Sequence, residues 1–338
     1  MTISDPAAVP VIDLAAPESD VACQIARACE DGGFFQIVGH GVKPTLTEAA
    51  MSEARAFFAR PKPDRRALSR TARNPWGYYD RELTKNLRDK KEIFDIGPDV
   101  EGMIGEDDLW SARTPWPKDG EAFRSTMRAS VDACEALSRR LLGLVSLGLG
   151  ADRGELDAAF APASTSFLRL NYYPLRDPLE DVADDAAPGV DLGIHHHTDA
   201  GALTVLLQDQ VDGLQVWRDD DWRGVAPTPG ALVVNIGDMI QVWSNDLYRA
   251  PVHRVLAMDT VERLSLPLFF NPAYEAVIAP LDRCVGAGRP ARYRPIRWGE
   301  FRQRRADGDF ADYGDEVQIS DYALPSPLAG EGGCEADG

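Results

Sequence analysis

The sequence predicts an α+β protein whose mostly β core, a two-sheet barrel of jelly-roll type, is flanked by helices from the N-terminal half. Two observations predict this class. From about 165 to 290 the chain alternates short strand-like runs with Gly, Pro and Asp turn signals, which is typical of antiparallel sheets. Several of these runs are apolar on both faces, so another layer has to cover them, and the helix-like first half is the available cover.

The first half predicts helices separated by short strands. Apolar runs bounded by turn residues indicate the strands, and apolar residues spaced three or four apart indicate the helices. The expected elements are strands at 10–14 and 34–38, a helix between them capped by Ser19 or Asp20, a helix from 43 to 60 and a long helix from 120 to 150. Residues 61–118, rich in Pro, Gly and charge, show few clear elements.

The second half predicts the barrel itself. The expected strands lie at 166–174, 202–208, 213–217, 231–237, 250–257 and 263–270, followed by a late helix at 298–310. The tail from about 324 is Gly, Ala and acid, and is expected to fray. The resulting division is an N-terminal region at 1–118, a supporting helix at 119–160, the β core at 161–290, a C-terminal helix and extension at 291–323 and a flexible tail at 324–338.

Composition excludes several classes of function. The 338 residues carry 36 Lys and Arg against 54 Asp and Glu, a net charge of −18, which disfavours nucleic acid as a partner. No apolar run reaches the ~20 residues of a membrane span. The N-terminus is acidic and lacks the basic start of a signal peptide, so a cytoplasmic location is expected. The five cysteines show no C-x-x-C spacing and are expected to be reduced thiols.

Three of the five histidines lie in the stretch IHHHTDAG at 194–201. In a strand, residues i and i+2 share a face, so His197 and Asp199 project together, His195 shares their parity and His196 points away. By itself a His-x-Asp pair is most often a surface hydrogen-bond pair. His253, on a later strand of the same barrel, supplies a third ligand. Two imidazoles and one carboxylate with open positions suit a non-haem Fe(II) centre.

A carboxylate receptor is expected close to this metal site. Arg263 and Ser265 share a strand face, and the turn MDTVE makes their strand the expected hairpin partner of the His253 strand. A guanidinium offers a planar pair of donors, and a hydroxyl adds a third hydrogen bond. In isolation Arg263 would be an ordinary surface arginine; beside the metal it would anchor one end of an acid that chelates the metal with its other end.

Several stretches closely resemble the isopenicillin N synthase-like family of Fe(II)- and 2-oxoglutarate-dependent oxygenases. They are HTDAGALTVLLQDQVDGLQV, PGALVVNIGDMIQVWSND, HRV and RLS in the second half, with VPVIDL, GFFQIVGHGV and KEIFDIG in the first. The resemblance covers most of the chain. It implies a double-stranded β-helix core, with His197, Asp199 and His253 as the iron ligands.

The resemblance also implies the co-substrates and the reaction. Arg263 and Ser265 would hold the distal carboxylate of 2-oxoglutarate, and Asn171 and Tyr173 of NYYP match a motif that helps to hold the oxoacid. Fe(II), 2-oxoglutarate and O2, with ascorbate in support, would hydroxylate a small-molecule substrate with release of succinate and CO2. The substrate is expected to meet variable segments at 74–96 and 271–280, and neither its identity nor the oligomeric state follows from the sequence.

Two alternatives stay open at this stage. One is an Fe(II) oxidase of the same fold that does not use 2-oxoglutarate and performs an oxidative cyclisation, with the Arg-x-Ser pair bound to the substrate's own carboxylate. The other is a non-catalytic barrel in which the same ligands hold Zn(II). His195 and His196 depart from the residues usual in the family; His195 could contact the pocket mouth, but a solvated loop position is expected for both.

Overall fold

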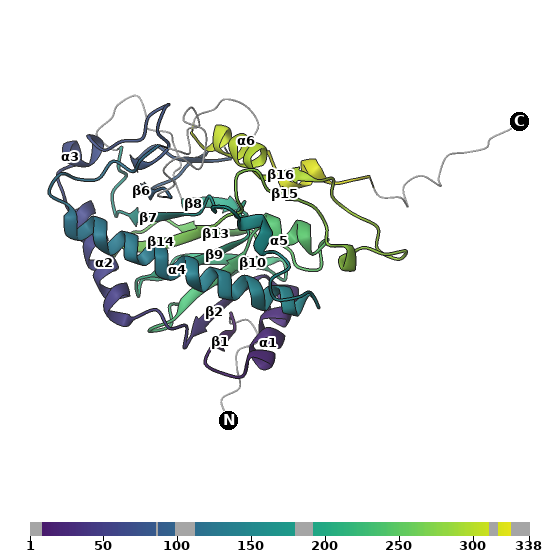
Figure 1. The fold of residues 1–338 in the computed structure, drawn as a ribbon. Coiled ribbons are helices and arrows are strands. Elements are labelled where there is room, and N and C mark those ends of the chain that lie inside the picture. Colours follow the sequence, from purple (N-terminus) through teal and green to yellow (C-terminus); the bar gives the residue numbers. More distant parts are fainter. Residues whose placement is uncertain (1–8, 86, 99–111, 180–191, 311–316, 326–338) are drawn as a thin grey trace, which may run out of the picture.

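Two β-sheets face each other, and helices cover the outer face of the larger one (Figure 1). This arrangement is seen in a computed structural model that describes residues 9–85, 87–98, 112–179, 192–310 and 317–325. The larger sheet runs in the order β1 (Val11–Asp13), β2 (Phe34–Val38), β12 (Leu232–Ile236), β9 (Leu203–Gln208), β14 (Arg263–Phe270), β7 (Phe167–Tyr173), β6 (Glu92–Ile96) and β3 (Gly77–Tyr79). The smaller sheet runs β11 (Asp221–Gly224), β10 (Leu214–Arg218), β13 (His253–Leu256) and β8 (Leu192–His197). The predicted α+β class with a jelly-roll core is confirmed.

Three helices of the first half form the outer layer, as predicted. They are α1 (Glu18–Asp31), α2 (Pro44–Phe58) and α4 (Glu121–Gly148), and α4 lies across β14 and β9. The predicted cap of the first helix is wrong: α1 begins directly after Pro17 and has no side-chain cap. The remaining helices are α3 (Lys62–Arg66), α5 (Asp238–Trp243) and α6 (Trp298–Phe310), with short 3-10 turns at Asp157–Phe160, Asp282–Cys284 and Ile319–Tyr322.

Strict alternation along β14 and β7 separates the helix-facing core from the space between the sheets. In β14, Leu264, Leu266 and Leu268 are buried in a cluster with residues of α2 and α4, because side chains at i and i+2 share a face. The intervening residues face the smaller sheet. In β7, Leu168 and Leu170 join the same cluster. Each strand therefore offers apolar groups to the helices and a different set of groups to the interior of the barrel.

The predicted hairpin between the His253 and Arg263 strands is wrong. His253 lies on β13 in the smaller sheet, whereas β14 pairs with β7 and β9 in the larger one. The segment MDTVE at 258–262 thus crosses between the sheets instead of turning back on its own strand. Crossing of this kind is how a jelly roll brings consecutive strands to opposite walls.

Two further features of the chain complete the fold. In the segment at 61–118, where few elements were expected, β6 is fully buried, and β4 (Leu83–Thr84) forms a small hairpin with β5 (Leu87–Arg88). A second small pair, β15 (Val277–Ile278) with β16 (Ile296–Arg297), precedes α6.

No helix among the described residues has the length and apolar character to cross a membrane. Most of the tail predicted to fray, from 326 onward, lies outside the described residues.

Candidate active site

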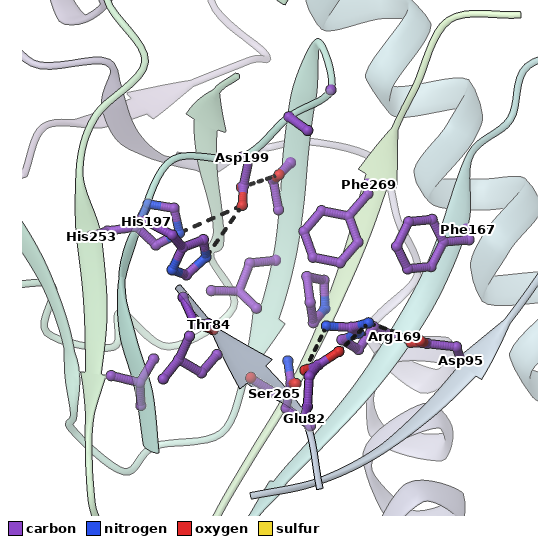
Figure 2. Close-up of a pocket in the computed structure, with 18 of the residues that line it drawn as sticks. Glu82, Thr84, Asp95, Phe167, Arg169, His197, Asp199, His253, Ser265 and Phe269 are labelled. Atoms are coloured by element: carbon purple, nitrogen blue, oxygen red, sulfur yellow. Dashed lines mark hydrogen bonds and ion pairs between the residues drawn. The ribbon is translucent and has the colours of Figure 1, made fainter. Parts of the chain in front are cut away.

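His197, Asp199 and His253 come together at one end of the space between the sheets (Figure 2). The antiparallel pairing of β8 with β13 sets His253 directly opposite His197. Asp199 Oδ1 lies 3.6 Å from His197 Nε2 and 3.7 Å from His253 Nε2. One nitrogen from each ring and one carboxylate oxygen all lie within 4.8 Å of one another. The three predicted ligands therefore share one point, as a metal site requires.

The outer sides of these three groups are held by hydrogen bonds. His197 Nδ1 is 2.8 Å from the His195 carbonyl oxygen, and His253 Nδ1 is 3.0 Å from that of Pro251. Since a carbonyl only accepts, both Nδ1 atoms carry the proton and both Nε2 lone pairs point inward. Asp199 Oδ2 accepts hydrogen bonds from Thr204 Oγ1 and, at 2.7 Å, from Asn235 Nδ2. Oδ1 is left facing the imidazoles, so the donor set fits a divalent cation.

Electrostatics at the metal-free site favour the metal-binding protonation states of Asp199 and His253, whereas the shift at His197 has the opposite sign. Burial alone would raise the pKa of Asp199, but His253, His197 and the Asn235 hydrogen bond hold it well below its usual range. Burial lowers the pKa of His253 to about 4, and the neighbouring His197 adds to this shift. Burial also lowers the pKa of His197, but Asp199 outweighs it and raises that pKa above its ordinary value. Ionised carboxylate and neutral imidazole are the forms that ligate metals.

The four residues predicted to hold an oxoacid lie on adjacent strands in register. Arg263 on β14 is the cross-strand partner of Tyr173 on β7, and Ser265 is the partner of Asn171. Arg263 is fully buried; its Nη2 donates to Gln208 Oε1 at 2.8 Å, and its guanidinium lies 5.1 Å from the Tyr173 ring centre. Among the described residues, Arg263 Nη1 and Asn171 Oδ1 are buried without a hydrogen-bond partner. An unsatisfied buried guanidinium donor fits the carboxylate of a bound acid.

These groups line one cavity of about 200 Å³. On the wall away from the metal ligands, Arg169 bridges Glu82, at 2.9 Å, and Asp95, at 2.7 Å (Figure 2). Phe167 and Phe269 stand beside this ion pair, their ring centres 4.8 Å apart. The cavity thus combines a metal end, a carboxylate-binding side and a third wall that is both aromatic and charged.

Part of the third wall comes from a segment that carried no clear pattern in the sequence. Within 74–96, the stretch expected to meet the substrate, the cavity-lining residues are Pro75, Trp76, Glu82, Leu83, Thr84, Lys91 and Asp95, and Asn271 lines it from the other expected stretch. The individual charged residues were not predicted, because an isolated Glu or Lys in a polar segment resembles any solvated surface residue. Only their buried pairing, Lys91 Nζ with Glu82 Oε2 at 2.6 Å, distinguishes them.

The two neighbouring histidines differ from the solvated loop position expected for them. Both lie on β8. His196 is exposed, whereas the His195 side chain is only 13% exposed and its Nδ1 lies 2.9 Å from Asp89 Oδ1. The expectation is therefore wrong for His195, because its partner comes from a distant segment that no local pattern reveals.

Comparisons with known proteins agree with this geometry. The model of the 2OG-Fe(II) oxygenase superfamily matches residues 164–272, and that of the non-haem dioxygenase in morphine synthesis N-terminal region matches 9–119. Jasmonate-induced oxygenase 2 from Arabidopsis thaliana is 32% identical over 87% of this chain and 78% of its own length. Gibberellin 2-beta-dioxygenase 4 from the same plant is 32% identical over 88% of this chain and 90% of its own.

Solved structures agree as well. The crystal structure of JOX2 in complex with 2OG, Fe and JA superposes with a TM-score of 0.80 at 31% identity, covering 94% of this chain and 89% of that one. A putative 2OG-Fe(II) oxygenase family protein from Caulobacter crescentus superposes with a TM-score of 0.76 at 25% identity, covering 88% and 98%. The chain belongs to the 2OG-Fe(II) oxygenase superfamily and is a 2-oxoglutarate-dependent non-haem iron dioxygenase.

Proposed function

We propose that this dioxygenase hydroxylates a small organic molecule, with Fe(II) held by His197 Nε2, Asp199 Oδ1 and His253 Nε2. The observation that carries the proposal is the convergence of these three atoms, each with its other polar atom already hydrogen-bonded. Three protein ligands leave further coordination positions for co-substrates. The iron, bound with 2-oxoglutarate and O2, supplies the oxidising chemistry that couples release of succinate and CO2 to hydroxylation of the substrate.

The protein's own part is binding and orientation. In this proposal Arg263 and Ser265 bind the distal carboxylate of 2-oxoglutarate, and Asn171 and Tyr173 hold the same molecule from β7. The buried position of Arg263 supports this role, because a desolvated guanidinium favours a charged partner. The space remaining between Phe167, Phe269 and the Arg169 ion pairs receives the substrate. A proton-abstracting base is not required of any side chain.

The proposed substrate is small because the cavity, of about 200 Å³, is small and lined by side chains of both sheets. Its walls are mixed in character, with aromatic rings and buried charges, which suits an organic molecule with an apolar body and polar substituents. Relatives named for gibberellin and flavonols, and the JOX2 complex with JA, involve molecules of this kind. Ascorbate is proposed as a supporting reductant.

Succinate release tests the proposal. Purified protein is incubated with Fe(II), ascorbate and a panel of small organic compounds, and O2 uptake and succinate are measured with and without 2-oxoglutarate. Succinate formation that depends on one compound, with an added oxygen atom in that compound by mass spectrometry, is expected. Substrate-dependent O2 uptake without succinate would instead indicate an oxidase that does not use 2-oxoglutarate.

Asp199→Ala is the matched inactive variant. It removes the only carboxylate of the three ligands, so bound iron and succinate release are expected to be lost. The circular dichroism spectrum should remain that of the parent protein, because Asp199 stands at the cavity. Retention of stoichiometric iron by this variant would show that the metal binds elsewhere.

A further inference from the structure

The strand that carries His197 lies at an edge of its sheet. Within the described residues, β8 pairs with a strand on one side only, β13, and that pairing is irregular, with register shifts on either side of Val255. An edge strand leaves backbone N–H and C=O groups that need other partners, and native proteins commonly cover such an edge with another segment. A metal ligand placed on such a strand needs additional support to keep its position.

Asp89 and Lys90 supply that support from the opposite side of β8. Asp89 Oδ1 accepts the backbone N–H of His195 at 3.0 Å, and the same oxygen lies 2.9 Å from His195 Nδ1. The backbone N–H of Lys90 donates to the Leu192 carbonyl at 3.0 Å. Together these contacts replace a neighbouring strand along the free edge of β8.

The Asp89 carboxylate is itself fixed in place. Its side chain is fully buried, and its second oxygen, Oδ2, accepts a hydrogen bond from Thr84 Oγ1 at 2.8 Å and lies 3.1 Å from Lys91 Nζ. Lys91 also pairs with Glu82. A buried carboxylate is tolerated when its lone pairs are all used in this way, and such a group holds its donors rigidly. Asp89 therefore joins β4 and β8 to Lys91, the residue directly before β6.

From Asp89 a short chain of contacts leads to the metal site. His195, held at its N–H and at its ring by Asp89, presents its carbonyl to His197 Nδ1 at 2.8 Å. That bond sets the tautomer and orientation of the His197 ring, and partners of this kind tune metal affinity.

We propose that Asp89 is a positioning residue for the iron ligand His197, acting through His195 on the edge strand β8. The inference rests on the proposed assignment of His197 as a ligand. Asp89 does not touch the metal or the substrate in this scheme. Its substitution should therefore change metal affinity and coordination geometry before it changes the overall fold.

Anaerobic titration of the metal-free protein with Co(II), in competition with a chelator, tests this role. Asp89→Asn places an amide NH2 either against Thr84 and Lys91 or against His195. The hydrogen bonds on one side of the carboxylate are therefore lost in either orientation of the amide. Co(II) affinity is expected to fall, by no more than the roughly 10- to 100-fold cost of losing a ligand's direct hydrogen-bond partner, because Asp89 acts one contact further from the metal. The visible spectrum of bound Co(II) should also change, which a purely structural defect in a folded protein would not produce.

Asp80→Asn is the matched control. Asp80 is a buried carboxylate of the same region that pairs with Arg66 and Lys62, and among the described residues it makes no hydrogen bond or ion pair with β8. Its substitution removes a similar charge, and Co(II) affinity and spectrum are expected to be those of the parent protein. Equal affinities for parent, Asp80→Asn and Asp89→Asn would overturn the positioning role.

Two further variants keep the test decisive. Asp199→Ala must abolish Co(II) binding at this site; if it does not, the ligand assignment itself fails, independently of Asp89. If Asp89→Asn does not fold, Thr84→Val removes a single donor from the Asp89 carboxylate while leaving the charge in place. Weaker Co(II) binding in a folded Thr84→Val protein supports the proposal, and unchanged binding overturns it.

Discussion

At the scale of the residue, Asp199 divides two tasks between its two oxygens. Oδ2 is occupied by Thr204 and Asn235, and Oδ1 faces His197 and His253. Because the carboxylate cannot rotate without breaking buried hydrogen bonds, its inward oxygen is oriented before any ligand arrives. Arg263 shows the same division, with one nitrogen on Gln208 and another unsatisfied among the described residues.

Arg263→Ala tests the second of these residues. Removing the guanidinium should weaken 2-oxoglutarate binding by about 2–5 kcal/mol, the cost of breaking a desolvated charge pair. Anaerobic calorimetric titration of the Co(II)-loaded protein with 2-oxoglutarate measures it. Arg254→Ala is a suitable control, since Arg254 lies over the Trp222 ring at 4.0 Å and does not line the cavity. An unchanged affinity in Arg263→Ala would refute the assigned role.

A pH-dependent effect is expected from Asp238. Burial raises its pKa to about 6, although the Arg305 guanidinium opposes the shift. A carboxyl whose folded-state pKa is raised contributes stability below its unfolded pKa of about 3.9 and loses it as the pH rises through the folded value. In metal-free protein, Asp238→Asn should therefore be more stable than the parent above pH about 6, with the difference shrinking toward pH about 4. Thermal melts across this range measure it, and a pH-independent difference would contradict it.

At the residue scale, sequence reasoning identified the groups that carry a local signature. The His-x-Asp spacing, the later His253 and the Arg-x-Ser pair are motifs, and the structure brings all five side chains to one cavity. The pairing of Asp89 with His195 was not predicted, because the two residues are far apart in the chain and no spacing rule connects them. The roles of Asn171 and Tyr173 rest on resemblance and stay predictions, as does the division of the chain into five regions.

At the scale of the element, the turn from β12 into α5 is hydrogen-bonded to the loop after β8, which carries Asp199. The backbone N–H of Asp238 donates to the Asp199 carbonyl at 2.8 Å, and that of Met239 donates to the Gly201 carbonyl at 3.0 Å. The loop after β8 is thereby bound to a buried helix start. Sequence patterns predicted β1, β2 and most of the barrel strands, since these patterns are local, but they missed β6 and β11 and did not give the sheet that each strand joins. The hairpin predicted through 258–262 was wrong because a short polar connection between two strands is compatible both with a hairpin turn and with a crossing from one sheet to the other.

Gly237→Ala should disturb the hydrogen bonds between the start of α5 and the loop that carries Asp199. A Cβ at Gly237 would lie 2.3 Å from the Gly201 carbonyl oxygen and 2.8 Å from that of Asp199, both backbone atoms that are hydrogen-bonded in place. Overpacking of this kind costs about 1–3 kcal/mol of unfolding free energy. Thermal denaturation and Co(II) titration should both show a loss. Gly224→Ala, where an added Cβ meets no atom within 4 Å, is the control and should behave as the parent.

At the scale of the whole molecule, the cavity depends on segments from both halves of the chain. The N-terminal half supplies Trp76, Glu82 and Lys91, and the C-terminal half supplies the metal ligands and Arg263. Helices α2 and α4 close the outer face of the larger sheet through an apolar cluster. The layer order was predictable, because helical and strand periodicities differ along the chain. The register of β6 against β7 was not, because pairing between distant segments leaves no trace in either segment alone.

Ligand-linked stabilisation is the expected signature at this scale. A ligand that binds only the folded state at 100 times its Kd adds about 2.7 kcal/mol. Adding 2-oxoglutarate to the Co(II)-loaded protein should therefore raise Tm by several degrees, and Arg263→Ala should lose this increment while keeping the one from Co(II) alone. Differential scanning fluorimetry measures both. An equal 2-oxoglutarate increment in parent and variant would place the acid elsewhere.

The contacts of Asp89 with Thr84, Lys91 and His195 limit which segments can be exchanged to give this fold a new substrate specificity. The stretch from 74 to 96 supplies part of the cavity wall that we propose contacts the substrate, so exchanging it is the obvious route to a new specificity. The same stretch carries the carboxylate that steadies the iron-binding edge strand. Exchanging the whole stretch would therefore change iron binding together with substrate specificity. An exchange that retains Asp89, Thr84 and Lys91 would allow substrate specificity to change while iron binding is kept.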